Sequence, residues 1–179
     1  MKNLICLLVF SALFVTPTLA QDAPDVPEAN PADVESVDAI IAAVYDVISG
    51  PAGQARDWDR FLSLFRPEAR LIPAGLRQDG SFFILNWKPE EYVLTAGGSL
   101  KENGFFETEI HRVQEGYGKI VHLFSTYESR RSADDEEPFA RGINSFQLVN
   151  DGSRWWVVNI FWQGESPANV IPNKYLPRG

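Results

Sequence analysis

The sequence predicts an α+β fold in which helices from the first half of the chain pack on a mostly antiparallel sheet. Three observations carry this prediction. Apolar residues recur at helical spacing between 30 and 50, and long stretches rich in β-branched and aromatic residues follow from 105 onward. In the segment 139–163, two such stretches flank the pair Asp151-Gly152. This pair is typical of a hairpin, because glycine accepts the positive φ that a tight turn requires.

The first 20 residues have the order of a secretory signal peptide. Lys2 precedes an apolar run from Leu4 to Val15, and Thr18-Leu19-Ala20 ends the segment with a small residue. The run is too short for a transmembrane span. We therefore expect a protein exported to the periplasm or the medium, whose mature chain begins at Gln21. The only cysteine, Cys6, lies inside this leader, so the mature chain offers no disulfide or cysteine metal site.

The mature chain is acidic. The full sequence has 16 Lys and Arg against 24 Asp and Glu, and the leader removes one lysine, which leaves 15 − 24 = −9. This charge argues against binding to nucleic acid, and against binding to a membrane after signal cleavage. Removing 20 of 179 residues leaves a length typical of one domain. We expect no cofactor.

The chain divides into a signal peptide (1–20), a flexible linker (21–32), a folded domain (33–165) and an extended strap (166–179). Asn30 is a good N-cap for a first helix, and Gly50-Pro51 ends it. A second helix is expected over 56–65 and a third over about 88–94, followed by a loop over 97–104. Short strands are expected at 70–73 and 81–86.

The strands 105–115 and 119–130 join near Gly116-Tyr117-Gly118 and precede the hairpin. A two- or four-residue connection puts one set of side chains on a single face, namely Phe105, Glu107, Glu109, His111 and Val113 with Ile120, His122, Phe124, Thr126 and Glu128. A three-residue connection breaks this grouping.

Both faces of the hairpin are apolar. Pairing across Asp151-Gly152 gives one face Arg141, Ile143, Ser145 and Gln147 with Trp156, Val158, Ile160 and Trp162. The other face receives Asn144, Phe146 and Leu148 with Trp155, Val157, Asn159 and Phe161. Neither face is polar enough to be exposed to solvent, so we expect other parts of the protein or a partner to cover both faces.

Three segments resemble the nuclear transport factor 2-like superfamily, which includes ketosteroid isomerases, limonene epoxide hydrolase and the SnoaL-like polyketide cyclases. They are RDWDRFLSLFRPEARLI (56–72), GYGKIVHLFSTYESR (116–130) and RGINSFQLVNDGSRWWVVNIFWQGE (141–165). The resemblance, which is greatest to exported bacterial members, implies a cone formed by a strongly bent sheet with three helices packed on its concave face. It also implies a pocket inside the cone and, commonly, a homodimer through the convex face.

The resemblance places particular residues inside the cone. These are Trp156, Val158, Ile160 and Trp162, with Arg141, Ile143 and Ser145 across from them, and Ile120, His122, Phe124 and Thr126 with their partners Glu109 and His111. The isomerase base has no equivalent among Leu71, Ile72 and the segment 82–86, and the inward aspartate of the isomerases falls near Asn144 or Ser145. The Asp-Arg-Asp set of the epoxide hydrolase is also missing. The known reactions therefore do not transfer to this chain.

The candidate catalytic residues are His122, His111 and Glu109. An imidazole beside a carboxylate in an apolar cone is suited to general base catalysis. The alternatives are a hydrogen-bonded structural patch and a zinc site, although no close H-x-H or H-x-x-E motif is present. We expect no metal. The acidic run 134–137 is a solvated loop or, alternatively, a calcium site.

The candidate ligand-binding residues form the walls of the predicted pocket. Arg141 opposite Trp162 either binds an anionic group of a ligand or pairs with Glu107, Glu128 or Glu165 at the mouth of the cone. The full set is Trp87, Phe124, Thr126, Arg141, Asn144, Ser145, Ile160 and Trp162.

Three classes of function follow. The first is an exported binder of a small, largely apolar molecule. The second is an isomerase, lyase or hydrolase that uses the His/Glu group, and the third is a dimeric structural module whose cone is filled by its own side chains. A homodimer is expected because five apolar residues share the convex face, namely Trp155, Val157, Phe161, Phe146 and Leu148.

Overall fold

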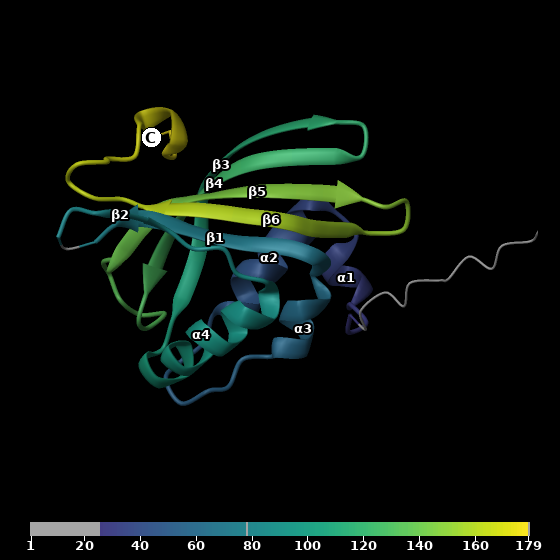
Figure 1. The fold of residues 1–179 in the computed structure, drawn as a ribbon, viewed down its shortest axis with the longest axis horizontal. Helices are drawn as coiled ribbons and strands as arrows, with labels where there is room; N and C mark the ends of the chain where they lie inside the picture. The colour runs from purple at the N-terminus through teal and green to yellow at the C-terminus, as the bar shows by residue number, and fades with distance from the viewer. Residues whose placement is uncertain (1–25, 78, 179) are drawn as a thin grey trace, which may run out of the picture.

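The computed structural model describes residues 26–77 and 79–178, which form a layer of helices against one curled sheet (Figure 1). The helices are α1 (Pro31–Val34), α2 (Val37–Ile48), α3 (Trp58–Ser63), α4 (Pro89–Asn103) and the short 3-10 helix η1 (Asn173–Tyr175). The strands are β1 (Phe65–Leu76), β2 (Phe82–Ile84), β3 (Phe106–Tyr117), β4 (Ile120–Arg130), β5 (Ala140–Asn150) and β6 (Trp155–Gly164). The predicted fold class is confirmed.

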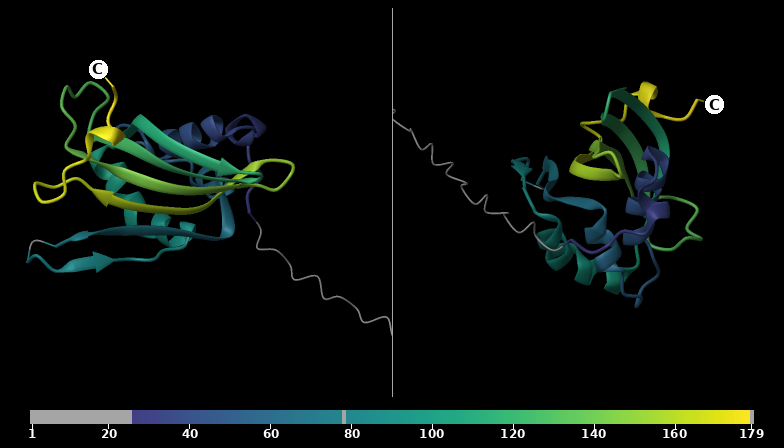
Figure 2. Two further views of the ribbon diagram at one scale, coloured as in Figure 1. Left: turned by 90° about the horizontal axis from the view of Figure 1, so that it is seen from above. Right: turned by 90° about the vertical axis from the view of Figure 1, so that its right-hand side faces the viewer.

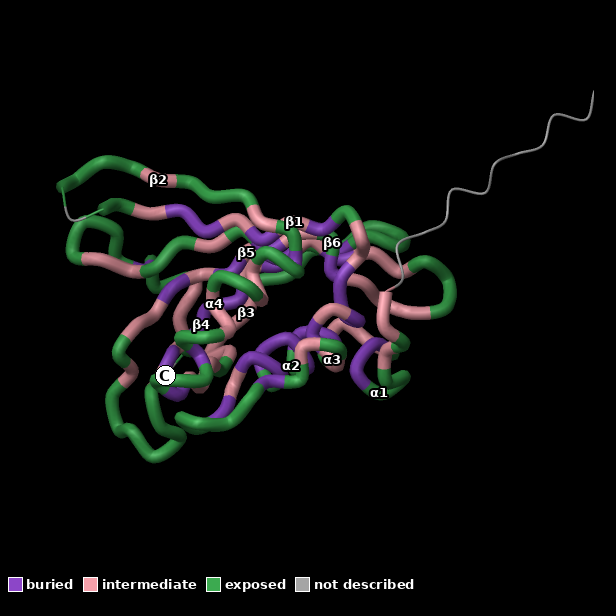
Figure 3. The backbone as a smooth tube through the Cα atoms, turned by 60° about the horizontal axis from the view of Figure 1, so that its bottom comes forward, coloured by how far each residue is buried: buried purple, intermediate pink, exposed green. Residues whose placement is uncertain are grey.

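The six strands lie in the order β2-β1-β6-β5-β4-β3, and neighbours are antiparallel except for the parallel pair β1 and β6. Helices α1–α4 lie on one side of the sheet and the C-terminal segment lies on the other, as the views in Figure 2 show. The core lies between the helices and the sheet (Figure 3). Its helical half is the stripe Ile40, Ile41, Val44, Tyr45 and Ile48 of α2, which follows helical spacing.

Two helices differ from their predicted lengths. The predicted helix that starts after Asn30 is divided, because Ser36 caps a second start: its hydroxyl accepts from the Ala39 amide at 3.0 Å. Helix α4 continues through the predicted loop 97–104 to Asn103. Gly97 in that stretch has a packing role, since a Cβ there would lie 3.0 Å from the Trp58 ring. Gly97 therefore marks a close contact with Trp58 and not the end of a helix.

Both predicted hairpins are present. The first uses the two-residue connection Gly118-Lys119, since Tyr117 pairs with Ile120 and Gly118 has φ +57°. The second closes between Asn150 and Trp155, so its loop is 151–154 and is two residues longer than predicted.

A β-bulge corrects the predicted faces of the second hairpin. Leu148 pairs with Val157 but Gln147 pairs with Asn159, which leaves Val158 unpaired. An extra residue on one strand moves every later side chain to the opposite face. Ile160 and Trp162 therefore lie on the concave face with Asn144, Phe146 and Leu148, whereas Ile143 and Ser145 lie on the convex face.

A second bulge corrects the first hairpin. Glu109 pairs with Tyr127 and His111 with Thr126, so the bulge lies at Ile110. As a result, Glu107 and Glu109 face the helices, whereas His111 faces the convex side.

The inward residues of β4 are also not those predicted. Val121, Leu123, Ser125, Tyr127 and Ser129 face the helices, which puts Ile120, His122, Phe124 and Thr126 on the convex side. The alternation of side chains along this strand does not identify its inward face, because both sets contain apolar residues.

Most of the residues from which a homodimer was predicted do not lie exposed on the convex face. Phe146, Leu148 and Val157 are buried in the core, and Trp155 packs against the core. Of the five residues in that prediction, only Phe161 is exposed on the convex face. The exposed apolar residues near the free end of that face are Tyr117, Ile120 and Val158. The homodimer itself remains a prediction, now assigned to different residues.

The predicted signal peptide and residues 21–25 of the predicted linker lie outside the described residues. Within 26–77 and 79–178, no helix has both the length and the apolar composition needed to cross a membrane.

Candidate functional site

A cavity of about 120 Å³ lies between the concave face of the sheet and helices α2, α3 and α4. Its walls are mainly aromatic and aliphatic, as expected for a site that takes a small organic molecule. The lining residues are Val44, Ile48, Phe61, Leu71, Tyr92, Phe105, Glu107, Tyr127, Asn144, Phe146, Ile160 and Trp162.

Glu107 is the charged side chain of this lining. Its carboxylate accepts hydrogen bonds from the Ser129 hydroxyl at 2.9 Å and from the Asn144 amide at 3.2 Å. Both donors are neutral, and none of the ion pairs within 26–77 and 79–178 includes Glu107. Burial without a cationic partner raises the pKa of Glu107 to about 7.

Tyr92 of α4 and Tyr127 of β4 add two hydroxyls to the same lining. Neither hydroxyl has a hydrogen-bond partner among the described side chains and backbone groups, and neither hydroxyl oxygen is fully buried. Burial, and then the negative charge of Glu107, raise the pKa of both phenols, so both remain neutral. Both hydroxyls are therefore free to bond a ligand.

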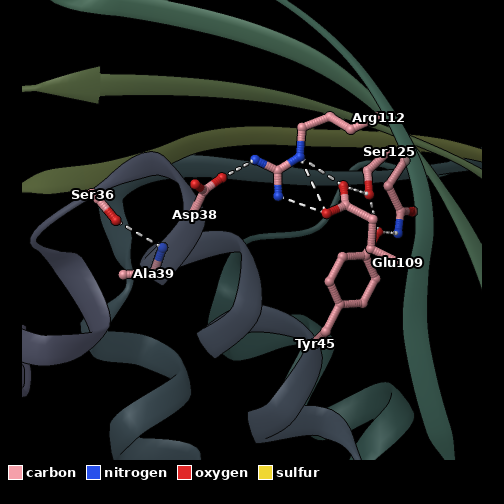
Figure 4. Close-up of polar contacts among 8 residues, drawn as sticks. Ser36, Asp38, Ala39, Tyr45, Glu109, Arg112 and Ser125 are labelled. Atoms are coloured by element: carbon pink, nitrogen blue, oxygen red, sulfur yellow. Dashed lines mark hydrogen bonds and ion pairs between the residues drawn. The ribbon is translucent and has the colours of Figure 1, made fainter.

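A hydrogen-bond network connects the cavity to the surface. The Asn144 amide donates to the Tyr45 hydroxyl at 3.1 Å, Tyr45 contacts the Ser125 hydroxyl at 2.6 Å, and Ser125 donates to Glu109 at 2.5 Å. Figure 4 shows Tyr45, Ser125 and Glu109 together with Arg112, which bridges Glu109 and Asp38 at 2.6 Å each. Since the only hydrogen of Ser125 goes to Glu109, Tyr45 must be the donor to Ser125.

The direction of this network fixes the position of Glu107. Both amide hydrogens of Asn144 are used, one toward Tyr45 and one toward Glu107. Each group therefore has one orientation that satisfies all of its partners, and a satisfied buried network is rigid. The carboxylate of Glu107 is thus held by elements β4, β5 and α2 acting together.

Glu107 and Glu109 of β3 have different surroundings. Glu109 pairs with Arg112, at 2.6 Å, whereas Glu107 has only neutral donors. A carboxyl with a pKa near neutrality can take up and release a proton at physiological pH. Among the carboxylates of the cavity and its network, Glu107 is therefore the group suited to general acid–base chemistry.

The predicted catalytic residues do not come together. His122 lies on the convex face, its side chain is 47% exposed, and its Nε2 lies 3.4 Å from a carboxylate oxygen of Glu115. His111 also lies on the convex side, and Glu109 lies on the concave side. The bulge at Ile110 and the inward face of β4 account for this separation.

The predicted ligand-binding residues are divided among three places. Asn144, Ile160 and Trp162 line the cavity, and Trp87 lies behind its wall with its ring centroid 6.3 Å from that of Tyr92. Arg141 pairs with Glu165 at 2.8 Å, which agrees with the ion-pair alternative. The remaining three lie on the convex face beside the C-terminal segment, namely Phe124, Thr126 and Ser145.

Phe124 and Ser145 line a second cavity, of about 210 Å³, between the convex face and the C-terminal segment. The Thr126 hydroxyl donates to the Tyr175 carbonyl at 2.6 Å, and Glu165 accepts from the Ile171 amide at 3.0 Å. Because Glu165 is already bonded to Arg141 and Ile171, its carboxylate is engaged within the protein. The first cavity, with its unbonded hydroxyls, is the better candidate site.

Sequence reasoning missed four residues of the site, namely Tyr45, Tyr92, Glu107 and Tyr127. One signal was present for Glu107, which lies in the strand directly after Phe105-Phe106 and was expected on an inward face. The tyrosines give no such signal, because a tyrosine at an inward position is ordinary core.

Comparison with solved structures identifies the fold. A protein of unknown function with a cystatin-like fold from Nostoc punctiforme superposes with a TM-score of 0.56 at 12% identity, covering 78% of this chain and 96% of that one. A nuclear transport factor 2-like protein of unknown function from Silicibacter pomeroyi gives 0.51 at 13% identity, covering 73% and 94%. The yeast Ubp3-associated protein Bre5 gives 0.51 at 12% identity, covering 72% and 92%.

This chain therefore has the nuclear transport factor 2-like fold, as the resemblance implied. No family model matches the sequence, and no curated protein matches it. Likeness at these identities defines the fold only.

Proposed function

We propose that the protein binds a small, largely apolar molecule in the cavity beside Glu107. One observation carries this proposal: an aromatic cavity is lined by a carboxyl and two tyrosines, and among the described residues the carboxyl has no charge partner and the two hydroxyls have no hydrogen-bond partner. A cone filled for stability alone has no use for a carboxyl on an apolar wall, because burying a carboxylate without a cationic partner is costly.

The size of the cavity limits the ligand. Its volume is about 120 Å³, whereas an engineered apolar cavity of roughly 150 Å³ holds benzene. The ligand is therefore a compound of about six non-hydrogen atoms, or the small end group of a longer molecule. The apolar walls bind its hydrocarbon part, and Glu107, Asn144, Tyr92 and Tyr127 orient its polar group.

A melting assay tests this function with a panel of soluble six-membered rings, namely tetrahydropyran, cyclohexanone and piperidine. A ring present at about 100 times its Kd stabilises the protein by about 2.7 kcal/mol, which raises the melting temperature by roughly 5–10 °C for a chain of this size. Val44→Phe, which fills the cavity, should abolish the shift.

The matched control is Val158→Phe, because Val158 is 39% exposed on the convex face. This variant should keep the shift of the wild type. If no ring in the panel raises the melting temperature of the wild type, or if Val44→Phe responds as the wild type does, the cavity is not the binding site.

We also propose that the protein is exported, and the proposal rests on the leader pattern of residues 1–20. The expected mature N-terminus is Gln21, and N-terminal sequencing of the protein from the periplasm or medium measures it directly. A chain that stays in the cytoplasm and still begins at Met1 would contradict the proposal.

A further inference from the structure

We propose that the ligand of this cavity is a small organic cation, an amine whose ammonium group lies against Glu107. This inference rests on the proposed function and goes beyond it by naming the class of ligand. It follows from charge, from hydrogen-bond capacity and from the aromatic walls, each of which points to a positively charged group.

The charge argument begins with the pairing of acidic side chains. Asp33 pairs with Arg60, Glu109 with Arg112 and Glu165 with Arg141, each at 2.6–2.8 Å. Glu107 has no such partner among the described residues, although it is partly buried on the wall of a mainly apolar cavity. A buried carboxylate without a cation is destabilising, and a cationic ligand supplies the missing charge. An anionic ligand would add a second negative charge beside the first.

The hydrogen-bond argument concerns acceptors. An ammonium group only donates, and it needs acceptors around it. Glu107, Tyr92 and Tyr127 all line the cavity, and each carries oxygen atoms that can accept a hydrogen bond. These groups can accept the two or three N–H bonds of a secondary or primary ammonium, and Asn144 keeps the carboxylate in place at 3.2 Å.

The aromatic argument concerns the rest of the ligand. Cations bind to aromatic faces through the ring quadrupole, and cages of this kind recognise alkylammonium groups. The ring centroids of Phe61 and Tyr92 lie 5.4 Å apart in a stacked arrangement, and Trp162 meets Tyr92 edge to face. Six aromatic side chains line the cavity, namely Phe61, Tyr92, Phe105, Tyr127, Phe146 and Trp162.

Binding should depend on pH through Glu107. Three other titratable side chains face it, namely Tyr45 from α2, Tyr92 from α4 and Tyr127 from β4, and their raised pKa values keep them neutral. Glu109 is held by Arg112 on the outer side of the network. An aliphatic amine stays protonated up to about pH 10. Of the ligand, Glu107 and the three tyrosines, only Glu107 therefore changes its charge below that pH.

The test compares two rings of the same size on the full-length chain by isothermal titration calorimetry. Piperidine carries a protonated nitrogen, and tetrahydropyran has a neutral oxygen at that position. The affinity for piperidine should rise about tenfold per pH unit from pH 5 to pH 6 and level off above pH 7. The affinity for tetrahydropyran should stay constant or fall as Glu107 loses its proton.

Glu107→Gln separates the two ligands further. At pH 8 the variant should lose at least about tenfold more affinity for piperidine than for tetrahydropyran. Tetrahydropyran binding equal to or tighter than piperidine binding at pH 8 would overturn the cation proposal and leave the cavity as a binding site. If Val44→Phe binds both rings as the wild type does, or if neither ring binds, both proposals fail.

Discussion

Glu107→Gln should make the protein more stable at pH 8, and change it little at pH 5. The pKa of Glu107 is raised from an ordinary 4.5 to about 7 in the folded protein. Between these values the folded state holds a proton that the unfolded state has released. The stability of the wild type therefore falls as the pH rises from about 4.5 to 7, and remains reduced above pH 7.

The size of this effect follows from the pKa. At about 1.4 kcal/mol for each pKa unit, the carboxylate costs up to roughly 3 kcal/mol above pH 7, and glutamine removes that cost. This corresponds to a gain of about 6–12 °C in the melting temperature. Urea melts of both proteins from pH 5 to pH 8 measure it, with the exposed substitution Glu68→Gln as control. An equal gain at both pH values would contradict the assignment.

Arg56→Met should be the most destabilising substitution among the arginines. The Arg56 guanidinium is buried and pairs with no described carboxylate. It donates hydrogen bonds to the carbonyls of Ile48, Gln54, Gly50 and Leu100 at 2.6–3.0 Å. These bonds satisfy carbonyls at the C-terminal ends of α2 and α4 that have no partner within their helix. Methionine fills similar space but leaves these carbonyls without their donor.

The expected loss for Arg56→Met is about 3–5 kcal/mol, because several buried acceptors lose their partner at once. The control is Arg70→Met, since Arg70 donates only to the nearby carbonyls of Glu68 and Ala69. Denaturant unfolding of both variants should place the control within about 1 kcal/mol of the wild type. A comparable loss in the two variants would show that Arg56 has no special structural role.

The elements of the fold were predictable because local sequence decides them. The helical stripe after Asn30, the caps and the glycine turns each depend on residues close together in the chain. The parallel pairing of β1 with β6 was not predictable in this way, because it joins Phe65 to Val157 across most of the domain. The nuclear transport factor 2-like resemblance supplied the curled sheet that local reasoning could not.

The site was predictable only in part, because two bulges decide which residues face inward. The bulge at Val158 brought Ile160 and Trp162 to the side of Asn144, and the bulge at Ile110 separated Glu109 from His111. A sequence with apolar residues on both faces contains no signal for such a bulge. Histidines were therefore assigned to the cavity in place of Glu107.

The most direct test of this account is the pKa of the Glu107 carboxyl, measured by carbon-13 NMR with Glu107→Gln to assign the signal. The account predicts a pKa of about 7 for the free protein. With saturating piperidine the pKa should fall, because the cation stabilises the carboxylate. A pKa close to 4.5 that piperidine leaves unchanged would mean that Glu107 is open to water, and would contradict the binding site proposed for this cavity.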